Sequence, residues 1–257
     1  MSSSAQKTDK IVVERYNWVE RWTHTFHAIA MLTLIFTGLA IYFGWGEIIS
    51  YHNARLLHMF MVPVLLVTNW ILVPYGILSH GWQEGGVKGI IKHFYYSYIF
   101  NKEDYYRLKG MILNFFGKQE KYPEFTVYNK ATGHYRTKLH PMFKIFIVLE
   151  GMCIFLILIT GIVLYAVDWN IVGIPIAHWL IIIFGWISPI LDMNALEFAR
   201  WLHLALTYFF IFELICHAFI LEFDTKVFKY WRSIFIDGKE YLDSPVVQVI
   251  DEDDHEH

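Results

Sequence analysis

Four long apolar segments dominate this sequence and leave it few ways to fold. They run approximately over Trp22–Phe43, Arg55–Leu78, Met142–Val167 and Phe198–Leu221. Each has about the 20 residues that an α-helix needs to cross the hydrocarbon core of a bilayer. Hydrophobic residues make up 56% of the 257-residue chain, more than the roughly 45–50% that is typical of soluble domains. The sequence therefore predicts an all-α integral membrane protein whose four transmembrane helices form a bundle.

A fifth apolar segment, Ile171–Leu191, raises the question of whether there are four spans or five. It contains Pro175, Gly185 and Pro189, which suit a membrane-surface or re-entrant segment better than a spanning helix. The basic residues also favour four spans, because nineteen of the 21 lie in Met1–Arg21, in Ser79–Lys144 or after Leu221. Four spans put these regions on one side, as the positive-inside rule favours. We expect a multi-pass protein of the bacterial cytoplasmic (inner) membrane with both termini in the cytoplasm.

The polar regions complete what we expect to be a single membrane domain, residues 1–257. A cytoplasmic connection, 79–141, is long and aromatic, and we expect amphipathic surface helices near His93–Phe100 and Tyr105–Phe116, followed by an irregular stretch. The cytoplasmic tail, 222–257, begins with a basic and aromatic segment that suits the lipid headgroup region.

Four histidines fall near the ends of the predicted spans. His203 and His217 are fourteen residues apart in the fourth span, so one helix carries both imidazoles on one side, about 21 Å apart along its axis. His24 begins the first span at the cytoplasmic end, where His217 ends the fourth. His58 begins the second span near the outer end, where His203 also lies. The predicted topology therefore gives an inner pair, His24 with His217, and an outer pair, His58 with His203.

Imidazole pairs between helices are typical of b-type haem proteins, and helical bundles hold such cofactors in their cores. The sequence has no CxxCH motif for covalent haem, and its two cysteines, Cys153 and Cys216, are too few for a cysteine-ligated iron–sulfur cluster. A lone histidine in a membrane helix often only donates a hydrogen bond to a neighbouring helix, but four at matched depths favour iron ligation. We predict two haems b.

The ligand assignment follows from the two depths. His24 and His217 are predicted to hold the inner haem iron, and His58 and His203 the outer one. His27, about one helical turn after His24, is the chief alternative for the inner ligand.

Two arginines and one glutamate are the other polar candidates in or beside the spans. Arg55 and Arg200 precede the outer histidines and could each bind a haem propionate or simply extend to the membrane interface. Glu213 lies in mid-span, where a carboxylate is costly. It could tune the inner haem or relay protons to a quinone, or it could be a neutral acid hydrogen-bonded to a neighbouring helix.

The first and third spans share a short sequence motif. Thr37-Gly38 in the first matches Thr160-Gly161 in the third. Small residues at such positions allow a flat macrocycle or another helix to approach the backbone closely.

These motifs resemble a known family. Arg21-Trp-Thr-His24 followed by Thr37-Gly38, then Arg55-Leu-Leu-His58 and the His203/His217 pair, are similar to the di-haem cytochrome b subunits of bacterial respiratory nickel–iron hydrogenases and formate dehydrogenases. The resemblance implies a membrane anchor for a periplasmic iron–sulfur subunit and a catalytic subunit. It also implies electron transfer between these partners and menaquinone or ubiquinone near the cytoplasmic face.

The region that borders the quinone in the formate dehydrogenase relatives is matched least well. Asn129, with His134 and Lys138 nearby, is the closest counterpart of their Asn/Gln-containing segment. The long connection 79–141 and the unusually apolar Ile171–Leu191 depart from the family pattern, which leaves the identity of the partner open.

The predicted function is thus electron transfer between a hydrogenase or formate dehydrogenase and the quinone pool. Such a subunit reacts with quinone but does not act alone on the primary substrate of its complex. One alternative is a cytochrome b of another quinone-linked oxidoreductase, such as a thiosulfate or polysulfide reductase, or one with a multihaem cytochrome partner. An alternative of a different class is a haem-free membrane anchor or small transporter. The net charge of −3 gives no indication of nucleic-acid binding.

Overall fold

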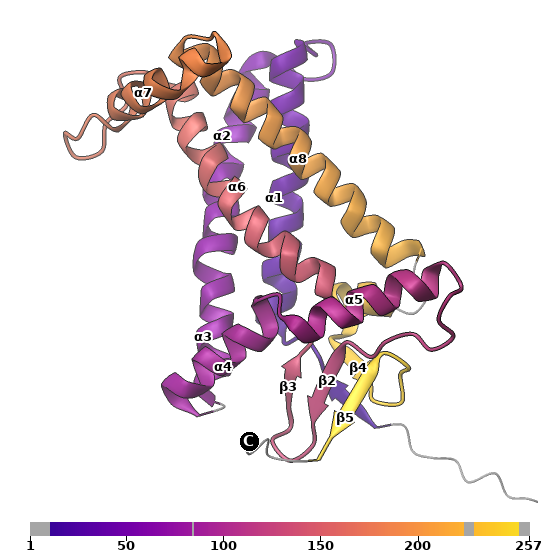
Figure 1. Ribbon diagram of the computed structural model, residues 1–257. Coiled ribbons are helices and arrows are strands. Elements are labelled where there is room, and N and C mark those ends of the chain that lie inside the picture. Colours follow the sequence, from indigo (N-terminus) through magenta and orange to yellow (C-terminus); the bar gives the residue numbers. More distant parts are fainter. Residues whose placement is uncertain (1–10, 84, 224–228, 252–257) are drawn as a thin grey trace, which may run out of the picture. The chain divides into compact units, whose positions relative to one another are not determined.

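The computed structural model describes residues 11–83, 85–223 and 229–251 (Figure 1). By length and composition, four helices in these ranges could cross a membrane. They are α1 (Trp18–Phe43), a continuous helix over Tyr51–Gln83, α6 (Pro141–Tyr165) and the Ala195–Ala218 part of α8 (Ala195–Phe223). The prediction of four long apolar helices is confirmed, and each lies within a few residues of its expected bounds.

The second of these helices changes its winding part-way along. It consists of α2 (Tyr51–Val67), a π-helical turn at Thr68–Leu72 and α3 (Val73–Gln83). The hydroxyl of Thr68 donates to the carbonyls of Val64 and Leu65, at 3.0 and 2.9 Å. π-Helical turns inside α-helices often mark functional sites.

The fifth apolar segment forms α7 (Ile176–Ile187) and a 3₁₀ turn at Ser188–Leu191. Its apolar helix, Ile176–Leu191, is shorter than the four candidate spans. Phe184 is buried and packs against Phe198 of α8, with ring centres 5.7 Å apart.

The connection between α3 and α6 holds two helices and a hairpin. The helices α4 (Gly86–Tyr98) and α5 (Lys102–Phe115) begin earlier than expected. Asn101 fixes the start of α5, because its side chain accepts hydrogen bonds from the backbone amides of Glu103 and Asp104.

The prediction of an irregular stretch after these helices was wrong over the hairpin. Strands β2 (Thr126–Asn129) and β3 (His134–Thr137) pair antiparallel, and Gly133, with φ of 73°, makes the turn before β3. Strands of four residues are too short to show a clear alternation of apolar and polar side chains.

The segments before α1 and after α8 complete the sheets. Strand β1 (Val12–Glu14) pairs antiparallel with β4 (Lys239–Tyr241). Strand β5 (Val247–Ile250) pairs parallel with β2, which gives the order β3-β2-β5. The tail also forms α9 (Lys229–Arg232) and a π-helical turn at Ser233–Asp237. The all-α expectation therefore needs correcting, since the polar regions contain strands that join residues far apart in the sequence.

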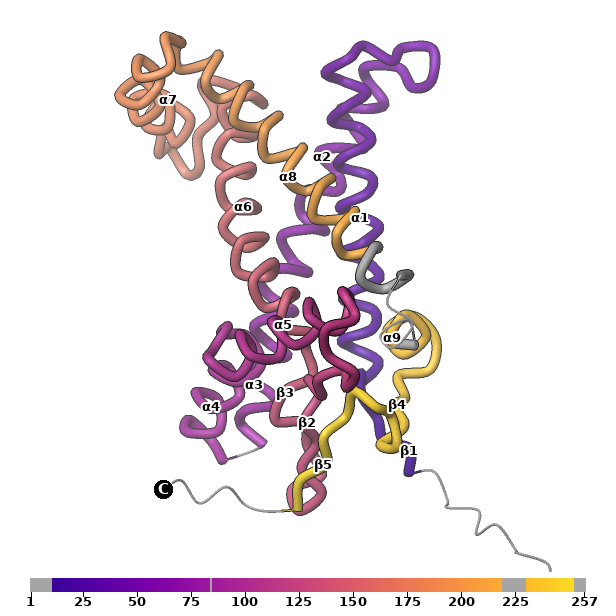
Figure 2. Tube along the Cα trace, turned by 45° about the vertical axis from the view of Figure 1, so that its right-hand side comes forward, coloured from indigo at the N-terminus to yellow at the C-terminus, as the bar shows by residue number. Residues whose placement is uncertain are grey.

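The chain divides into two compact units. The strand-bearing unit comprises the described residues of 1–33, 59–145 and 218–257, and its apolar core includes Phe125, Tyr230, Val246 and Val247. Figure 2 shows β1 beside β4 and β2 beside β5 within it. The helical unit comprises 34–58 and 146–217, with a core around Val163.

Candidate haem site

The two outer histidines face each other inside the helical unit. His58 lies on α2 and His203 on α8. The centres of their rings are 6.5 Å apart, and the ring planes meet at 47°. The structure thus brings together two residues that are 145 positions apart and that the sequence paired only by predicted depth.

A threonine holds each ring in the same way. The hydroxyl oxygen of Thr37 lies 2.9 Å from Nδ1 of His58, and that of Thr160 lies 2.9 Å from Nδ1 of His203. Both hydroxyls also donate to carbonyls of their own helices, Thr37 to Leu34 at 3.3 Å and Thr160 to Ile157 at 3.0 Å.

These contacts assign the tautomer of both imidazoles. Because each threonine hydroxyl gives its proton to a carbonyl, it accepts the proton of the ring Nδ1–H. Nε2 then carries the lone pair on both rings. Metal-binding histidines typically donate their second ring N–H in this manner, which fixes the ring orientation.

The glycine that follows each threonine gives the ring room. A Cβ on Gly38 would lie 3.5 Å from Cε1 of His58, and one on Gly161 would lie 3.4 Å from Cε1 of His203. At these distances a Cβ would make an ordinary van der Waals contact with each ring, so each ring lies close to the backbone of the helix that carries the glycine. The repeated Thr-Gly pair in the sequence therefore corresponds to two similar contacts. In each, the Thr-Gly pair on one helix contacts a histidine ring from another helix.

The spacing of the outer rings fits axial ligation of one iron. A metal–imidazole bond is about 2.0–2.1 Å, and with about 1.1 Å from the bonded nitrogen to the ring centre, two opposed ligands have ring centres about 6.3 Å apart. His58 and His203 match that separation. No group of three or more His, Cys, Asp or Glu in the described ranges could hold a bare metal ion.

The inner histidines fall in different units. His24 belongs to the strand-bearing unit, where its ring meets that of Phe235 edge-on at 5.1 Å, and His217 belongs to the helical unit. Their pairing stays a prediction. The alternative ligand His27 has its Nδ1 3.4 Å from the hydroxyl of Thr68. This contact resembles those of Thr37 with His58 and of Thr160 with His203. His27 and His24 therefore both remain candidates for the inner ligand.

The remaining candidates in the helical unit have contacts of different kinds. Arg55 donates to the carbonyl of Tyr165 at 3.3 Å and lies over its ring, 5.2 Å from the centre, so it binds the C-terminal end of α6. Arg200 is exposed on α8, and Glu213 is partly exposed one turn before His217. A role of the arginines at a propionate, or of Glu213 in proton transfer, stays a prediction.

The three candidates from the connection lie at or near the hairpin. Asn129 ends β2 and accepts a hydrogen bond from the amide of Ala131 at 2.9 Å. His134 lies opposite Asn129 in the sheet. Lys138 binds the carboxylate of Glu20 at 2.5 Å. These contacts stabilise the turn and the unit around it, and contact with a quinone stays a prediction for all three.

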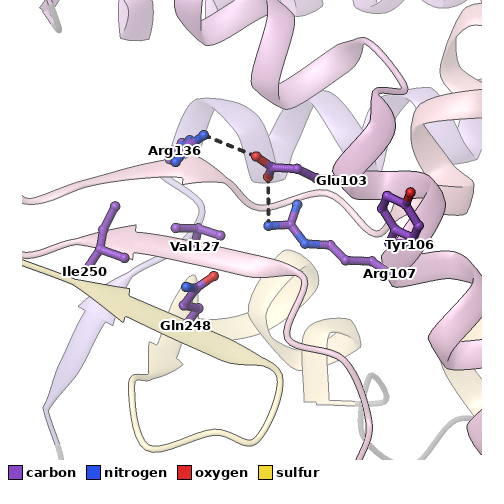
Figure 3. A pocket seen from close by; sticks show the side chains of 7 residues that line it. All are labelled: Glu103, Tyr106, Arg107, Val127, Arg136, Gln248 and Ile250. Atoms are coloured by element: carbon purple, nitrogen blue, oxygen red, sulfur yellow. Dashed lines mark ion pairs between the residues drawn. The ribbon is translucent and has the colours of Figure 1, made fainter. Parts of the chain in front are cut away.

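A pocket lies beside the hairpin in the strand-bearing unit (Figure 3). The sequence gave no indication of it. Glu103 binds Arg107 at 3.2 Å and Arg136 at 3.5 Å across it. Tyr106, Val127, Gln248 and Ile250 complete the lining. Its single carboxylate is shared by both arginines, and none of the predicted site residues lines it.

Comparison with known proteins decides the family. No family model matches the chain. A protein of Methanosarcina mazei described as "F420 non-reducing hydrogenase II cytochrome subunit" is 56% identical over 232 residues, which cover 90% of this chain and 84% of that protein. This chain belongs to the family of hydrogenase cytochrome subunits. The hydrogenase part of the sequence resemblance is thereby confirmed, and the formate dehydrogenase part is not shown.

In this hydrogenase cytochrome subunit, replacing Thr37 with valine should weaken binding of the outer haem that we predict at His58 and His203. Valine keeps the size of threonine but cannot accept the Nδ1–H of His58. Loss of such outer-shell partners typically lowers metal affinity about 10–100-fold. The rate of haem loss to an excess of a haem-scavenging apoprotein measures the effect. Thr33→Val is the matched control, since its hydroxyl donates to the carbonyl of Ile29 on the same helix. Equal haem loss from the two variants would contradict the assignment.

Proposed function

We propose that this hydrogenase cytochrome subunit carries electrons across a membrane between a hydrogenase and a lipid-soluble electron carrier of the quinone class. Two haems b would be bound, the outer by His58 and His203 and the inner by His24 and His217. The geometry of His58 and His203 is the observation that carries the proposal, because their ring centres lie 6.5 Å apart, close to the separation expected of two imidazoles that bind one iron. The kinship with a hydrogenase cytochrome subunit supports it.

Haem b, when bound by two imidazoles, supplies one-electron transfer with no open coordination site. The protein residues supply the rest of the chemistry. Thr37 and Thr160 orient the two rings and hold their protons on Nδ1, away from the iron. Gly38 and Gly161 leave space for the rings beside the backbone.

A membrane location is supported by the side chains along the helices. Many large apolar residues on the candidate spans are exposed in the isolated chain, among them Phe36, Phe60, Met152, Phe155 and Phe212. Such faces need lipid or a partner helix to cover them. We propose the cytoplasmic membrane as the location of the subunit.

The strand-bearing unit supports the proposed topology. Pairing of β1 with β4 and of β2 with β5 joins the segment before α1, the connection between α3 and α6, and the segment after α8. Four crossings put these three regions on the same side, whereas five would separate the last from the others. We propose that this side is the cytoplasm. The iron–sulfur and catalytic subunits of the hydrogenase would then bind at the opposite face.

A spectrum of the purified protein tests the proposal directly. Reduction with dithionite should give the absorbance bands of low-spin haem b, at two haems per chain by pyridine haemochrome assay. In the intact complex with its hydrogenase, molecular hydrogen should reduce the same haems. A colourless chain, or haems that hydrogen does not reduce within the complex, would overturn the proposal.

A further inference from the structure

The pocket beside the hairpin has no part in the proposed haem chemistry. It encloses about 390 Å³, which is within the usual size range of pockets for small ligands. Figure 3 shows its walls, which come from α5 and from the strands β2, β3 and β5. These elements all belong to the strand-bearing unit, so one compact unit forms the whole pocket.

The residues that line the pocket carry two positive charges and one negative charge. Arg107 and Arg136 are the cations, and Glu103 is the carboxylate. One oxygen of Glu103 lies 3.2 Å from Nη2 of Arg107, and the other lies 3.5 Å from Nη2 of Arg136. A guanidinium has five N–H donors, so two guanidiniums offer more donors than one carboxylate can use. The lining therefore favours a further anion.

Contacts outside the pocket fix both arginines in place. The guanidinium of Arg136 lies over the ring of Tyr96, 4.1 Å from the ring centre. Nη1 of Arg107 lies 3.5 Å from Oδ1 of Asp104, and Oδ2 of the same carboxylate lies 2.8 Å from Nζ of Lys144. The side chains of Asp104 and Lys144 are 1% and 0% exposed, so they form a buried neutral pair. Asp104 therefore positions Arg107, while Lys144 balances the charge of Asp104.

Exposure lets a ligand reach the arginines. The side chain of Glu103 is 51% exposed, whereas those of Arg107 and Arg136 are 15% and 23% exposed. Water screens an exposed carboxylate, so its ion pairs with the arginines are weak. Partly buried guanidiniums are screened less, and they attract an anion more strongly. Glu103 is thus an internal anion that an external one can replace.

The other lining groups favour a phosphate group as that external anion. Arginine binds the oxygens of phosphate and carboxylate groups through its planar fork of donors. A carboxylate has two oxygens, and Glu103 already places one on each arginine. A phosphate group has more oxygens, so it can contact both arginines and also accept from the amide of Gln248, which lines the same pocket. Val127 and Ile250 form an apolar wall beside these groups.

We propose that this pocket binds a phosphate group, with Arg107 and Arg136 as its ligands and Glu103 as its internal competitor. Two sources carry this chemistry, the headgroup of an anionic phospholipid and a soluble phosphate ester. The ion pair of Asp104 with Lys144 joins α5 to the first turn of α6, so the pocket lies close to the polar end of a candidate span. The sequence after Ile250 is acidic, which lowers the affinity for any anion but leaves its dependence on the two arginines unchanged.

Isothermal titration calorimetry on the purified full-length chain in a non-ionic detergent tests this site. Glycerol 3-phosphate represents the soluble source, and phosphatidylglycerol with short acyl chains represents the lipid source. At least one of these probes should bind at one site per chain. Arg107→Gln and Arg136→Gln should each lower the affinity for that probe by about tenfold or more, because each variant loses a charge-assisted hydrogen bond.

Glu103→Gln should change the affinity in the opposite direction. Glutamine fills the same space as glutamate but does not compete for the arginines by charge, so the affinity should rise by about threefold or more. Structural damage would lower the affinity, and a gain therefore distinguishes competition from damage. Arg232→Gln is the matched control. It removes an arginine of the same unit that is 71% exposed and pairs with Asp237 at 2.8 Å, and it should leave the affinity unchanged.

The outcomes identify the source and test the site itself. Binding of glycerol 3-phosphate would assign a soluble ligand, and binding of phosphatidylglycerol alone would assign a lipid. A wild-type chain that binds neither probe would refute the proposal, as would binding that both arginine variants leave unchanged or that Glu103→Gln weakens. If one arginine variant failed to fold, the other and Glu103→Gln would decide. Haem content does not enter this readout, so the phosphate site and the proposed electron transfer are tested independently.

Discussion

Replacing His58 with alanine should remove one of two haems and leave the other, so the reduced-minus-oxidised absorbance should fall by about half. The reason is geometric. His58 supplies one of the two imidazoles whose ring centres lie 6.5 Å apart, and the methyl group of alanine is too short and inert to replace it. His203→Ala should have the same effect, and the double variant should lose no more haem than either single one. Pyridine haemochrome assays on purified, detergent-solubilised protein measure the haem content.

The control for this prediction is His178→Ala. His178 is exposed at the start of α7 and should keep the full haem content. Loss of both haems from the double variant, with one lost from each single variant, would show that His58 and His203 serve different irons. Full retention of haem in either single variant would contradict the outer site altogether.

Replacing Arg15 with methionine should destabilise the strand-bearing unit by about 3–5 kcal/mol, the usual cost of breaking a buried ion pair from one side. The side chains of Arg15 and Glu240 are 1% and 0% exposed and bind each other directly. Burial by itself would lower the pKa of Arg15, but Tyr16, Tyr230 and Glu240 raise it well above its ordinary value, so the guanidinium is always charged. Without it, the buried carboxylate of Glu240 loses the cation that binds it directly. Tyr230 still donates to it at 2.7 Å.

Hydrogen exchange of the backbone amides in β2 and β5 measures this loss, which should lower their protection about 150- to 5000-fold where exchange follows unfolding of the unit. Adding Glu240→Gln should recover much of the stability, because glutamine is neutral and still accepts from Tyr230. The matched control is Lys121→Met, which breaks a surface pair whose lysine is 80% exposed and should cost about 0.2–1 kcal/mol. Equal protection in Arg15→Met and Lys121→Met would refute a central role for the buried pair.

The apolar helices could be predicted well because the period and length of their side-chain pattern are local properties. Each span needs only its own twenty or so residues to be recognised. The strands could not be predicted in this way. Strands β1 and β4 have three residues each, and they pair with each other across more than 200 positions of sequence. Short strands draw their stability from partners that are distant in the sequence.

The outer haem site could be predicted as a pair of histidines but not as a complete site. Depth along the helices identified His58 and His203. The sequence shows the threonines only as a repeated Thr-Gly pair. It gives no sign that Thr37 contacts a ring on another helix. The stacked rings of His80 and His93 were missed for the same reason, because they meet where α3 and α4 cross at Gly81, and the sequence shows no crossing.

The way the strand-bearing unit is assembled has a consequence for biosynthesis. Strand β2, in the connection between α3 and α6, pairs with β5, whose residues 247–250 are made after all four candidate spans. The membrane helices are therefore complete before this sheet can close. A ribosome that stops between α8 and β5 would release a chain with the four predicted haem ligands and no finished sheet, which gives quality-control proteases an open strand edge by which to recognise truncated copies.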